Sequence, residues 1–336
     1  MPRKVSFITN AGGRFGLGHL TRCAALAEEL QDEGSDVDII LGRESPPTQK
    51  EKELGGLIHR LSAAISIVDQ DGTRSVHPDL KSKIAADKTD TVFLDSYQIG
   101  PRFQSQIRET GAVTIVIDDE AVNQYDCDHL INYAPTASED DYLPLLLSSS
   151  KLHLGLDFFP VSSKLREQRE RTENKKNYLC ICLGGSGSEL ITYNLVSNLR
   201  QCEVIDDFEE VVVINGLSPE KQDELALGSK LTIVSQPPNY LELIGDSRAA
   251  ITGAGVSALE RVYLKNSGVI IAVADNQVPN YDYLTKHDFF VGYQCSTQGP
   301  SELNQAIERG LSLSIPSNII DGLAGQRISN LIGGTR

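Results

Sequence analysis

The residues best suited to chemistry lie in a glycine-rich segment near the start of the chain. Residues 12–22 read GGRFGLGHLTR and follow the apolar run 5–8. Glycines such as Gly16 and Gly18 let a ligand approach the backbone, and the helix predicted to follow offers its amino terminus to an anion. Histidine is the side-chain type best suited to acid–base chemistry near neutral pH; His19 follows the last glycine, and Arg22 comes three residues later. A structural turn needs the glycines but not the histidine, so we predict that His19 has a functional role.

A second glycine-rich turn, in the latter half of the chain, also enters a predicted helix. Residues 252–260 read TGAGVSALE and contain Gly253, Gly255, Val256, Ser257 and Glu260. Such a turn directs backbone N–H groups and the positive end of the helix dipole at an anion. We therefore expect a diphosphate to bind at residues 253–257.

Five further loops follow predicted strands and carry polar side chains. They contain Asp95 and Tyr97, Asp118 and Asp119, Asn132 and Tyr133, Gly184, Gly185 and Ser186, and Asn276 and Gln277. Ligands of parallel α/β sheets bind beyond the carboxyl ends of the strands, so we expect chemistry in these loops. The Asp118–Asp119 pair has two interpretations, a metal or acid–base site and a helix N-cap with an acid in the first turn. Tyr97 either contacts the substrate or packs on the wall of the site.

The elements that must position these loops alternate along the chain. Apolar strands are predicted at 5–8, 37–41, 65–68, 91–94, 113–117, 129–131, 178–183, 211–214, 231–234, 249–251, 268–273 and 289–292. Helices are predicted among them, for example over 22–32 and 101–110. Short apolar strands interleaved with helices indicate parallel sheets covered on both faces. The predicted fold class is therefore α/β, with two doubly wound Rossmann-like domains that face each other across a cleft.

Length and charge predict where the two domains divide. At 336 residues the chain is longer than one hydrophobic core usually supports. The charged segment 162–177 has almost no apolar face. We therefore predict a first domain at 1–160, a linker at 161–177 and a second domain at 178–336.

Composition narrows the classes of partner. The formal net charge of -15 argues against nucleic acid or an anionic membrane as the main partner. The chain starts without a signal-peptide pattern and has no apolar run near the roughly 20 residues that span a bilayer. We expect a cytoplasmic protein, a monomer or weak homo-oligomer, with no metal and no cofactor. Its six cysteines are expected to be reduced, and Cys180 and Cys182 to pack in a buried strand.

Seven motifs, in this order, resemble those of the PseG/SpsG group. They are GxGHxxR at 16–22, DSY at 95–97, DD at 118–119, GGS at 184–186, GxSxxE at 255–260, NQ at 276–277 and DGxxGQRI at 321–328. The group comprises UDP-sugar hydrolases of the pseudaminic acid pathway and their spore-coat-polysaccharide relatives, built on the GT-B fold. The resemblance spans roughly residues 5–332.

The resemblance implies hydrolysis of a UDP-linked diacetamido-trideoxy sugar at its anomeric carbon, in the biosynthesis of surface polysaccharides or nonulosonic acids. It implies that His19 is the base that activates water and that Tyr97 and Asn276 line the sugar site. Glu260 would accept the ribose hydroxyls, the alternative being a solvated surface acid. The other residues expected to bind substrate or nucleotide are Gly16, Gly18, Arg22, Asp95, Asp119, Gly184, Gly185, Ser186, Gly253, Gly255, Val256, Ser257 and Gln277.

Two other functions remain open. A glycosyltransferase would use the same UDP loops, and the chain departs from the family pattern at Asn10, 187–188, Leu190, Val256 and Leu259. A lipid-linked transferase would be expected to show an apolar or basic membrane-facing patch, whereas residues 43–60 mix basic and acidic side chains. A non-catalytic binder would need only the UDP loops, without the combination of a histidine, a tyrosine and an asparagine that the resemblance places at the sugar.

Overall fold

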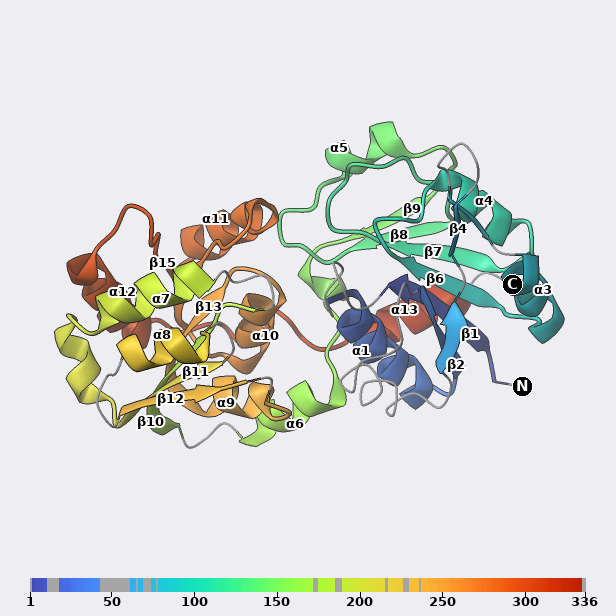
Figure 1. The fold of residues 1–336 in the computed structure, drawn as a ribbon. Coiled ribbons are helices and arrows are strands. Elements are labelled where there is room, and N and C mark those ends of the chain that lie inside the picture. Colours follow the sequence, from blue (N-terminus) through green and yellow to red (C-terminus); the bar gives the residue numbers. More distant parts are fainter. Residues whose placement is uncertain are drawn as a thin grey trace. The chain divides into compact units, whose positions relative to one another are not determined.

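The computed structural model describes residues 2–10, 18–42, 61–64, 66–68, 74–76, 78–171, 175–184, 189–214, 217–225, 230–235 and 237–333. These residues form two compact units. Unit 1 comprises Met1–Ser163 and Gly322–Arg336, and unit 2 comprises Lys164–Asp321. Figure 1 shows that each unit is a sheet covered by helices.

Unit 1 contains a parallel sheet with the strand order β3-β2-β1-β6-β7-β8-β9. Its strands are β1 (Lys4–Asn10), β2 (Asp36–Gly42), β3 (Leu61–Ala64), β6 (Thr91–Asp95), β7 (Val113–Ile117), β8 (His129–Asn132) and β9 (Lys151–Leu154). A separate antiparallel pair is formed by β4 (Ser66–Val68) and β5 (Arg74–Val76). The helices are α1 (Gly18–Asp32), α3 (Pro78–Asp87), α4 (Pro101–Arg108), α5 (Glu139–Tyr142), η2 (Leu143–Leu145), η3 (Leu156–Phe158) and α13 (Ala324–Gly333).

The central strands of unit 1 are buried on both faces. Every residue of β6 is buried, although successive side chains of a strand point to opposite faces of the sheet. Phe7 of β1 and Phe93 of β6 are register partners, and their rings stack with centroids 4.5 Å apart. Such strands read as continuous apolar runs, which is the pattern that the sequence shows.

Unit 2 contains a second parallel sheet with the strand order β12-β11-β10-β13-β14-β15. Its strands are β10 (Lys176–Cys182), β11 (Glu210–Ile214), β12 (Leu231–Val234), β13 (Ser247–Gly253), β14 (Gly268–Ile271) and β15 (Val291–Gly292). Its helices are α7 (Glu189–Leu199), η4 (Glu203–Asp207), α8 (Pro219–Glu224), α9 (Tyr240–Asp246), α10 (Val256–Leu264), η6 (Asp275–Gln277), α11 (Val278–Lys286) and α12 (Pro300–Ser312). The helix α6 (Ser163–Arg171) lies at the boundary of the two units.

The strand orders place a switch point in each sheet. In unit 1 the chain moves outward from β1 to β2 and β3, then returns to add β6 on the other side of β1. In unit 2 it moves from β10 to β11 and β12, then adds β13 on the other side of β10. Loops separate at such points and leave a crevice beyond the carboxyl ends of the strands. Both glycine-rich segments singled out from the sequence follow a strand at a switch point, β1 and β13 respectively.

The predicted α/β class with two doubly wound sheets is confirmed, with differences in detail. Residues 65–68 were expected to form one strand, but Ser66–Val68 pair with β5 in a separate two-stranded sheet, while the unpredicted β3 and β9 occupy the edges of the main sheet. The second domain was expected to run to residue 336, whereas Gly322–Arg336 cluster with unit 1 because α13 packs on α1. Among the described residues, no helix is both long enough and apolar enough to span a membrane. All six cysteines are free, and Cys180 and Cys182 pack in the core as predicted.

Candidate active site

A buried cluster of polar side chains in unit 1 lies at the switch point of its sheet. His19 and Arg22 are three residues apart in the first turns of α1, so they share one face of the helix. Asp95 is the last residue of β6, the neighbour of β1 in the sheet. The side chains of His19 and Arg22 are each 6% exposed and that of Asp95 is 0% exposed, so water is nearly excluded from their contacts.

Asp95 is the centre of this cluster. Arg22 Nε donates to Asp95 Oδ2 at 2.6 Å, and Arg22 Nη2 donates to Oδ1, so the guanidinium and carboxylate pair through two bonds. The Cys23 thiol donates to Oδ2 at 3.3 Å. Burial alone would raise the pKa of Asp95, but the charge and hydrogen bonds of Arg22, together with the bond from His19, hold that pKa below its usual range. Asp95 is therefore an ionised, fully occupied acceptor.

The geometry assigns a tautomer to His19. Its Nδ1 lies 2.7 Å from Asp95 Oδ1 and 2.8 Å from Arg22 Nη2. An ionised carboxylate can only accept, so the short contact with Oδ1 requires a proton on Nδ1. The Nη2 group already donates to Oδ1 and needs no second acceptor at the ring. With the proton on Nδ1, the neutral ring keeps its lone pair on Nε2, which is the form required of a general base.

Asp119 and two tyrosines extend the cluster toward solvent. Arg22 Nη1 donates to Asp119 Oδ2 at 2.7 Å and to the hydroxyl of Tyr133 at 3.3 Å. Tyr97 donates from its hydroxyl to Asp119 Oδ1 at 2.9 Å. Its ring meets the ring of His19 edge to face, with centroids 4.6 Å apart, and the residue is 40% exposed. Tyr97 therefore lies beside the histidine with much of its surface accessible to a ligand.

Asp118 has a structural role, but it is not the expected helix N-cap, because residues 119–128, between β7 and β8, contain no helix. Its Oδ2 accepts from the backbone N–H groups of Glu120 and Ala121 and, at 2.8 Å, from the hydroxyl of Tyr142. Asp119 is committed to Arg22 and Tyr97 instead. The two carboxylates thus bind different partners, and no group of three or more His, Cys, Asp or Glu side chains among the described residues is placed to hold a metal ion.

In unit 2 the glycine turn before α10 is closely packed from both sides. A Cβ on Gly253 would lie 3.0 Å from the carbonyl oxygen of Leu183, and one on Gly255 would lie 3.3 Å from Gln277 Nε2. Gln277 in turn accepts a hydrogen bond from the backbone N–H of Val273. Gly255 is the N-cap of α10 and provides no side-chain cap to the first turn. The turn therefore presents an uncapped helix terminus, braced by Gln277.

Glu260 lies one turn into α10, and its two carboxylate oxygens differ in their surroundings. Oε1 accepts a hydrogen bond of 2.6 Å from the Tyr240 hydroxyl of α9. Oε2 is buried and has no hydrogen-bond partner among the described residues. Burial raises the pKa of Glu260 to about 7, against the lowering effect of the Tyr240 hydrogen bond. With 6% of its surface exposed, Glu260 is not the solvated surface acid that was its other interpretation.

The remaining predicted residues divide into three sets. Gly16, Gly185 and Ser186 lie outside the described residues. Gly184 has φ +80° after β10, a conformation that favours glycine, and Gly18 is exposed at the start of α1. Val256, Ser257 and Asn276 are exposed or half-buried in unit 2, where they are accessible to a ligand. Asp95 was expected to contact substrate or nucleotide, but its complete burial and full set of partners leave it no surface for that contact.

The sequence assigned no role to two tyrosines that hold site residues in place. Tyr133 follows β8 in one of the loops at the carboxyl edge of the sheet, and it contacts Arg22. Its signal was its position after a strand. Tyr240 begins α9, and no pattern in its surroundings indicated that it would meet Glu260.

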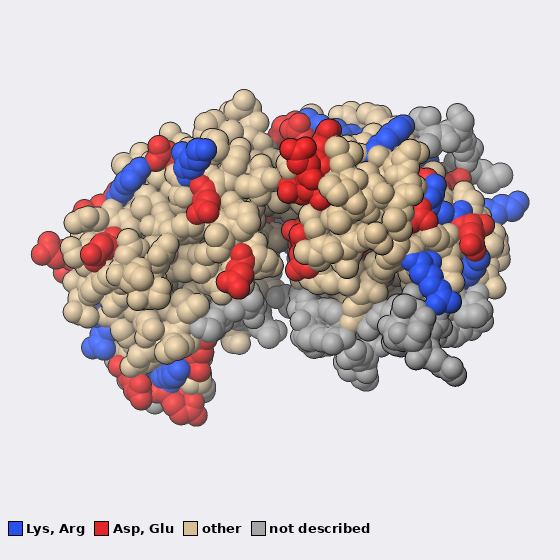
Figure 2. Space-filling view, turned by 90° about the horizontal axis from the view of Figure 1, so that it is seen from above, with Lys and Arg blue, Asp and Glu red and all other residues tan. Residues whose placement is uncertain are grey.

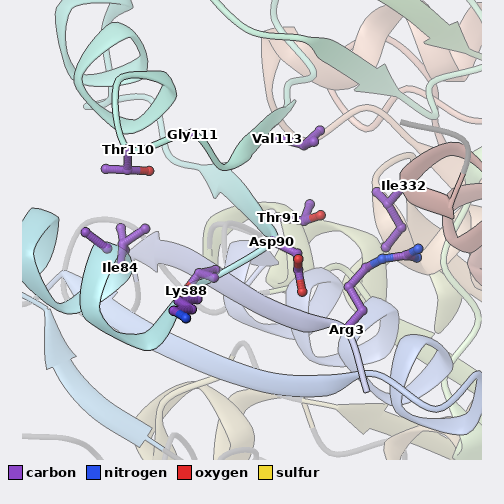
Figure 3. Close-up of a pocket in the computed structure, with 11 residues that line it drawn as sticks. Arg3, Ile84, Lys88, Asp90, Thr91, Thr110, Gly111, Val113 and Ile332 are labelled. Carbon is purple, nitrogen blue, oxygen red and sulfur yellow. The ribbon is translucent and has the colours of Figure 1, made fainter. Parts of the chain in front are cut away.

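Surface charge is mixed, and a cavity of unit 1 lies away from the predicted site residues. In the view of Figure 2 acidic and basic side chains are interspersed, with acids gathered at one place on unit 1. Figure 3 shows a cavity of about 360 Å³ lined by Arg3, Lys88, Asp90, Thr91 and Ile332 among others. It lies at the amino ends of β1 and β6, the edge opposite to Asp95, and it contains none of the predicted site residues.

Comparison with known proteins agrees with the resemblance seen in the motifs. No family model matches the chain. It is 22% identical over 303 residues to a UDP-2,4-diacetamido-2,4,6-trideoxy-beta-L-altropyranose hydrolase of Campylobacter jejuni, covering 87% of this chain and 99% of the relative. It is 24% identical over 301 residues to an uncharacterized protein of Methanocaldococcus jannaschii, covering 84% of this chain and 58% of that one.

Solved structures of glycosyltransferases share the fold. Acinetobacter baumannii MurG matches with a TM-score of 0.61 and 18% identity, over 98% of this chain and 99% of its own. The glycosyltransferase of kitacinnamycin matches with a TM-score of 0.60 and 13% identity, over 99% of this chain and 96% of its own. The fold is therefore of the GT-B type.

Proposed function

We propose that this protein hydrolyses a UDP-linked diacetamido-trideoxy sugar. The proposal is supported by its GT-B fold and by its similarity, over most of its length, to a hydrolase of such a UDP-sugar. The products would be the free sugar and UDP. The observation that carries the proposal is the contact of His19 Nδ1 with Asp95 Oδ1 at 2.7 Å. It leaves Nε2 of a neutral histidine as proton acceptor beside the accessible ring of Tyr97.

In the proposed reaction a water oxygen forms a bond to the anomeric carbon as the bond from that carbon to the diphosphate oxygen breaks. His19 Nε2 takes the water proton, and UDP departs as an anion. Asp95 stabilises the resulting imidazolium through Nδ1, so Asp95 is a positioning residue. A single displacement without a covalent intermediate inverts the anomeric centre.

The leaving group needs stabilisation of negative charge more than it needs a proton. We assign the diphosphate to the turn Gly253–Ser257 and the uncapped first turn of α10 in unit 2. We assign the ribose to Glu260, because a buried carboxylate oxygen without a partner is costly unless a ligand group binds it. Oε2 is screened from water in the free protein, so neighbouring side chains must move before a ribose hydroxyl reaches it. Asn276 and Tyr97 are assigned to the sugar.

A second candidate function is transfer of the sugar to an acceptor, which is favoured by the fold shared with glycosyltransferases. The same base and nucleotide site would then act on an acceptor hydroxyl in place of water. A non-catalytic binder would not need the His19–Asp95 pair.

The deciding experiment incubates the protein with a panel of UDP-sugars in water enriched in oxygen-18, with and without a mixture of candidate acceptors. We expect UDP release without acceptor or divalent cation, in excess chelator, with the label in the free sugar and not in UDP. Label in UDP would show cleavage at phosphorus and overturn the assigned step. Release that depends on an acceptor would establish the transferase, and no release with any UDP-sugar would leave the binder.

A further inference from the structure

The two carboxylate oxygens of Glu260 have different surroundings. Tyr240 occupies Oε1 at 2.6 Å, and Oε2 is buried without a hydrogen-bond partner among the described residues. A deeply buried, half-satisfied carboxylate is costly to keep ionised. It therefore points either to a proton held in the free protein or to a donor supplied by a ligand.

We propose that Tyr240 is a positioning residue for Glu260, and that nucleotide binding at this pair expels one proton to solvent. The inference rests on the nucleotide site of the proposed function. In the free protein near neutral pH, Glu260 holds a proton as a carboxylic acid and still accepts the hydrogen bond from Tyr240. When a ribose hydroxyl donates to Oε2, the carboxylate becomes the favoured form, and its proton leaves.

The groups around Glu260 support this assignment. From α9, Tyr240 is the ionisable group that contacts it, and burial together with the charge of Glu260 raises the pKa of that tyrosine far above its usual value, so it remains a donor. From β10, the Cys182 thiol is near Tyr240 and buried.

On α10 itself, Arg261 donates to Thr252 and to the carbonyls of Asn266, Ser267 and Val269. Arg261 is thus fully engaged elsewhere, and Glu260 has no neighbouring cation to keep it ionised among its described contacts.

The pH dependence has a definite sign. Glu260 has a pKa of about 7 in the free protein, and a donated hydroxyl bond lowers it. Protonated Glu260 predominates below that pH and must lose its proton on binding, so UDP affinity rises with pH and levels off above the pKa. Replacing Tyr240 by Phe removes a hydrogen bond that lowers the pKa, which moves the rise to higher pH.

The experiment measures UDP binding by calorimetry from pH 5.5 to 9 in buffers of different ionisation enthalpy. The phosphate of UDP also titrates in this range. Glu260→Gln is therefore the reference variant, because the protons that it releases or takes up on binding come from UDP and not from residue 260. We expect wild type to release up to one proton more than Glu260→Gln near pH 6. Tyr240→Phe should lower UDP affinity at pH 7 severalfold, because a larger share of Glu260 is then protonated before binding, and should shift the pH midpoint upward.

Tyr263→Phe is the matched control, because it removes a hydroxyl from α10 on a ring that faces Arg169. It should leave the affinity and the midpoint unchanged. If Glu260→Gln binds UDP as tightly as wild type, the nucleotide assignment of the proposed function fails. If Glu260→Gln binds weakly but Tyr240→Phe keeps the wild-type midpoint, or wild type releases no extra proton, the present inference is overturned while the nucleotide site stands.

Discussion

At the scale of single residues, the partner of one ring nitrogen decides what the other nitrogen can do. Asp95 accepts a hydrogen bond from Nδ1–H of His19, so Nε2 of the neutral ring carries the lone pair. An asparagine in place of His19 keeps a polar side chain at the start of α1 but offers no base. We expect His19→Asn to lower turnover by a factor of about 10²–10⁴, the usual contribution of a general base.

UDP binding by the same variant should stay close to wild type, since the nucleotide is assigned to unit 2. Turnover on a panel of UDP-sugars and calorimetry with UDP check the two halves of this prediction. If His19→Asn retained turnover within a few-fold of wild type, the histidine would only brace the glycine segment.

Asp95 should matter for stability as well as for positioning. In Asp95→Asn the buried guanidinium of Arg22 loses a charged partner, which typically costs about 3–5 kcal/mol. The pKa of Asp95 is held below its usual range, so its contribution to the free energy of unfolding is complete above the ordinary pKa of an aspartate. That contribution is lost only as the pH falls through the lowered value.

Denaturant unfolding checks this prediction. The difference between wild type and Asp95→Asn should be constant from pH 5 to 8 and shrink only in strong acid. Asp140→Asn on the exposed helix α5 is the control and should change stability by no more than about 0.5 kcal/mol. A difference that already shrinks between pH 7 and 5 would contradict the direction of the pKa shift.

At the scale of elements, the turn between β13 and α10 tests the diphosphate assignment. A Cβ on Gly253 would press on the carbonyl of Leu183, which belongs to the backbone after β10 and cannot move alone. Overpacking of this kind costs about 1–3 kcal/mol. We expect Gly253→Ala to weaken UDP binding about tenfold by displacing the turn. Gly299→Ala, where the nearest atom is 3.6 Å away, should bind UDP like wild type.

The elements also show what the sequence could and could not predict. β7 has the predicted bounds, because buried strands of parallel sheets read as short apolar runs. β12 also has the predicted bounds, because Leu231, Ile233 and Val234 form an apolar run although the strand is half-buried at the edge of its sheet. β9 was missed because its residues Lys151–Leu154 are half-exposed at the edge of the sheet and lack such a run. The motifs placed His19, Arg22 and Asp119 among the site residues, and the structure brings the three side chains together. The Tyr240–Glu260 contact joins two helices through side chains that no local pattern relates.

At the scale of the whole molecule, Glu29 of α1 ties together the two places where the chain crosses the boundary of the units. Its Oε1 accepts from the backbone N–H of Val161 at 2.7 Å, just before α6. Its Oε2 accepts from the backbone N–H of Gly325 in the first turn of α13. Glu29 is buried, and a carboxylate at a helix amino terminus is stabilised by the helix dipole. The segment by which the chain leaves unit 1 and the segment by which it returns are therefore both hydrogen-bonded to the Glu29 side chain.

This arrangement predicts that the two units respond differently to one substitution. Glu29→Gln replaces charged acceptors by an amide, and hydrogen bonds to charged groups contribute about 1.5–3 kcal/mol each. We expect unit 1 to unfold more easily while unit 2 is unchanged. The unfolding transition of unit 2 is the one that UDP shifts to higher temperature in calorimetry. A ligand at a hundredfold excess over its Kd adds about 2.7 kcal/mol to the free energy of unfolding of the unit that binds it.

Glu28→Gln provides the matched control for this prediction. Glu28 is the neighbour of Glu29 and accepts solvent-exposed bonds from Ser163, so its substitution should move neither transition by much. If Glu29→Gln lowered the UDP-sensitive transition as much as the UDP-insensitive one, the two units would unfold as a single cooperative body. Glu29 would then stabilise the whole chain, and not the first unit alone.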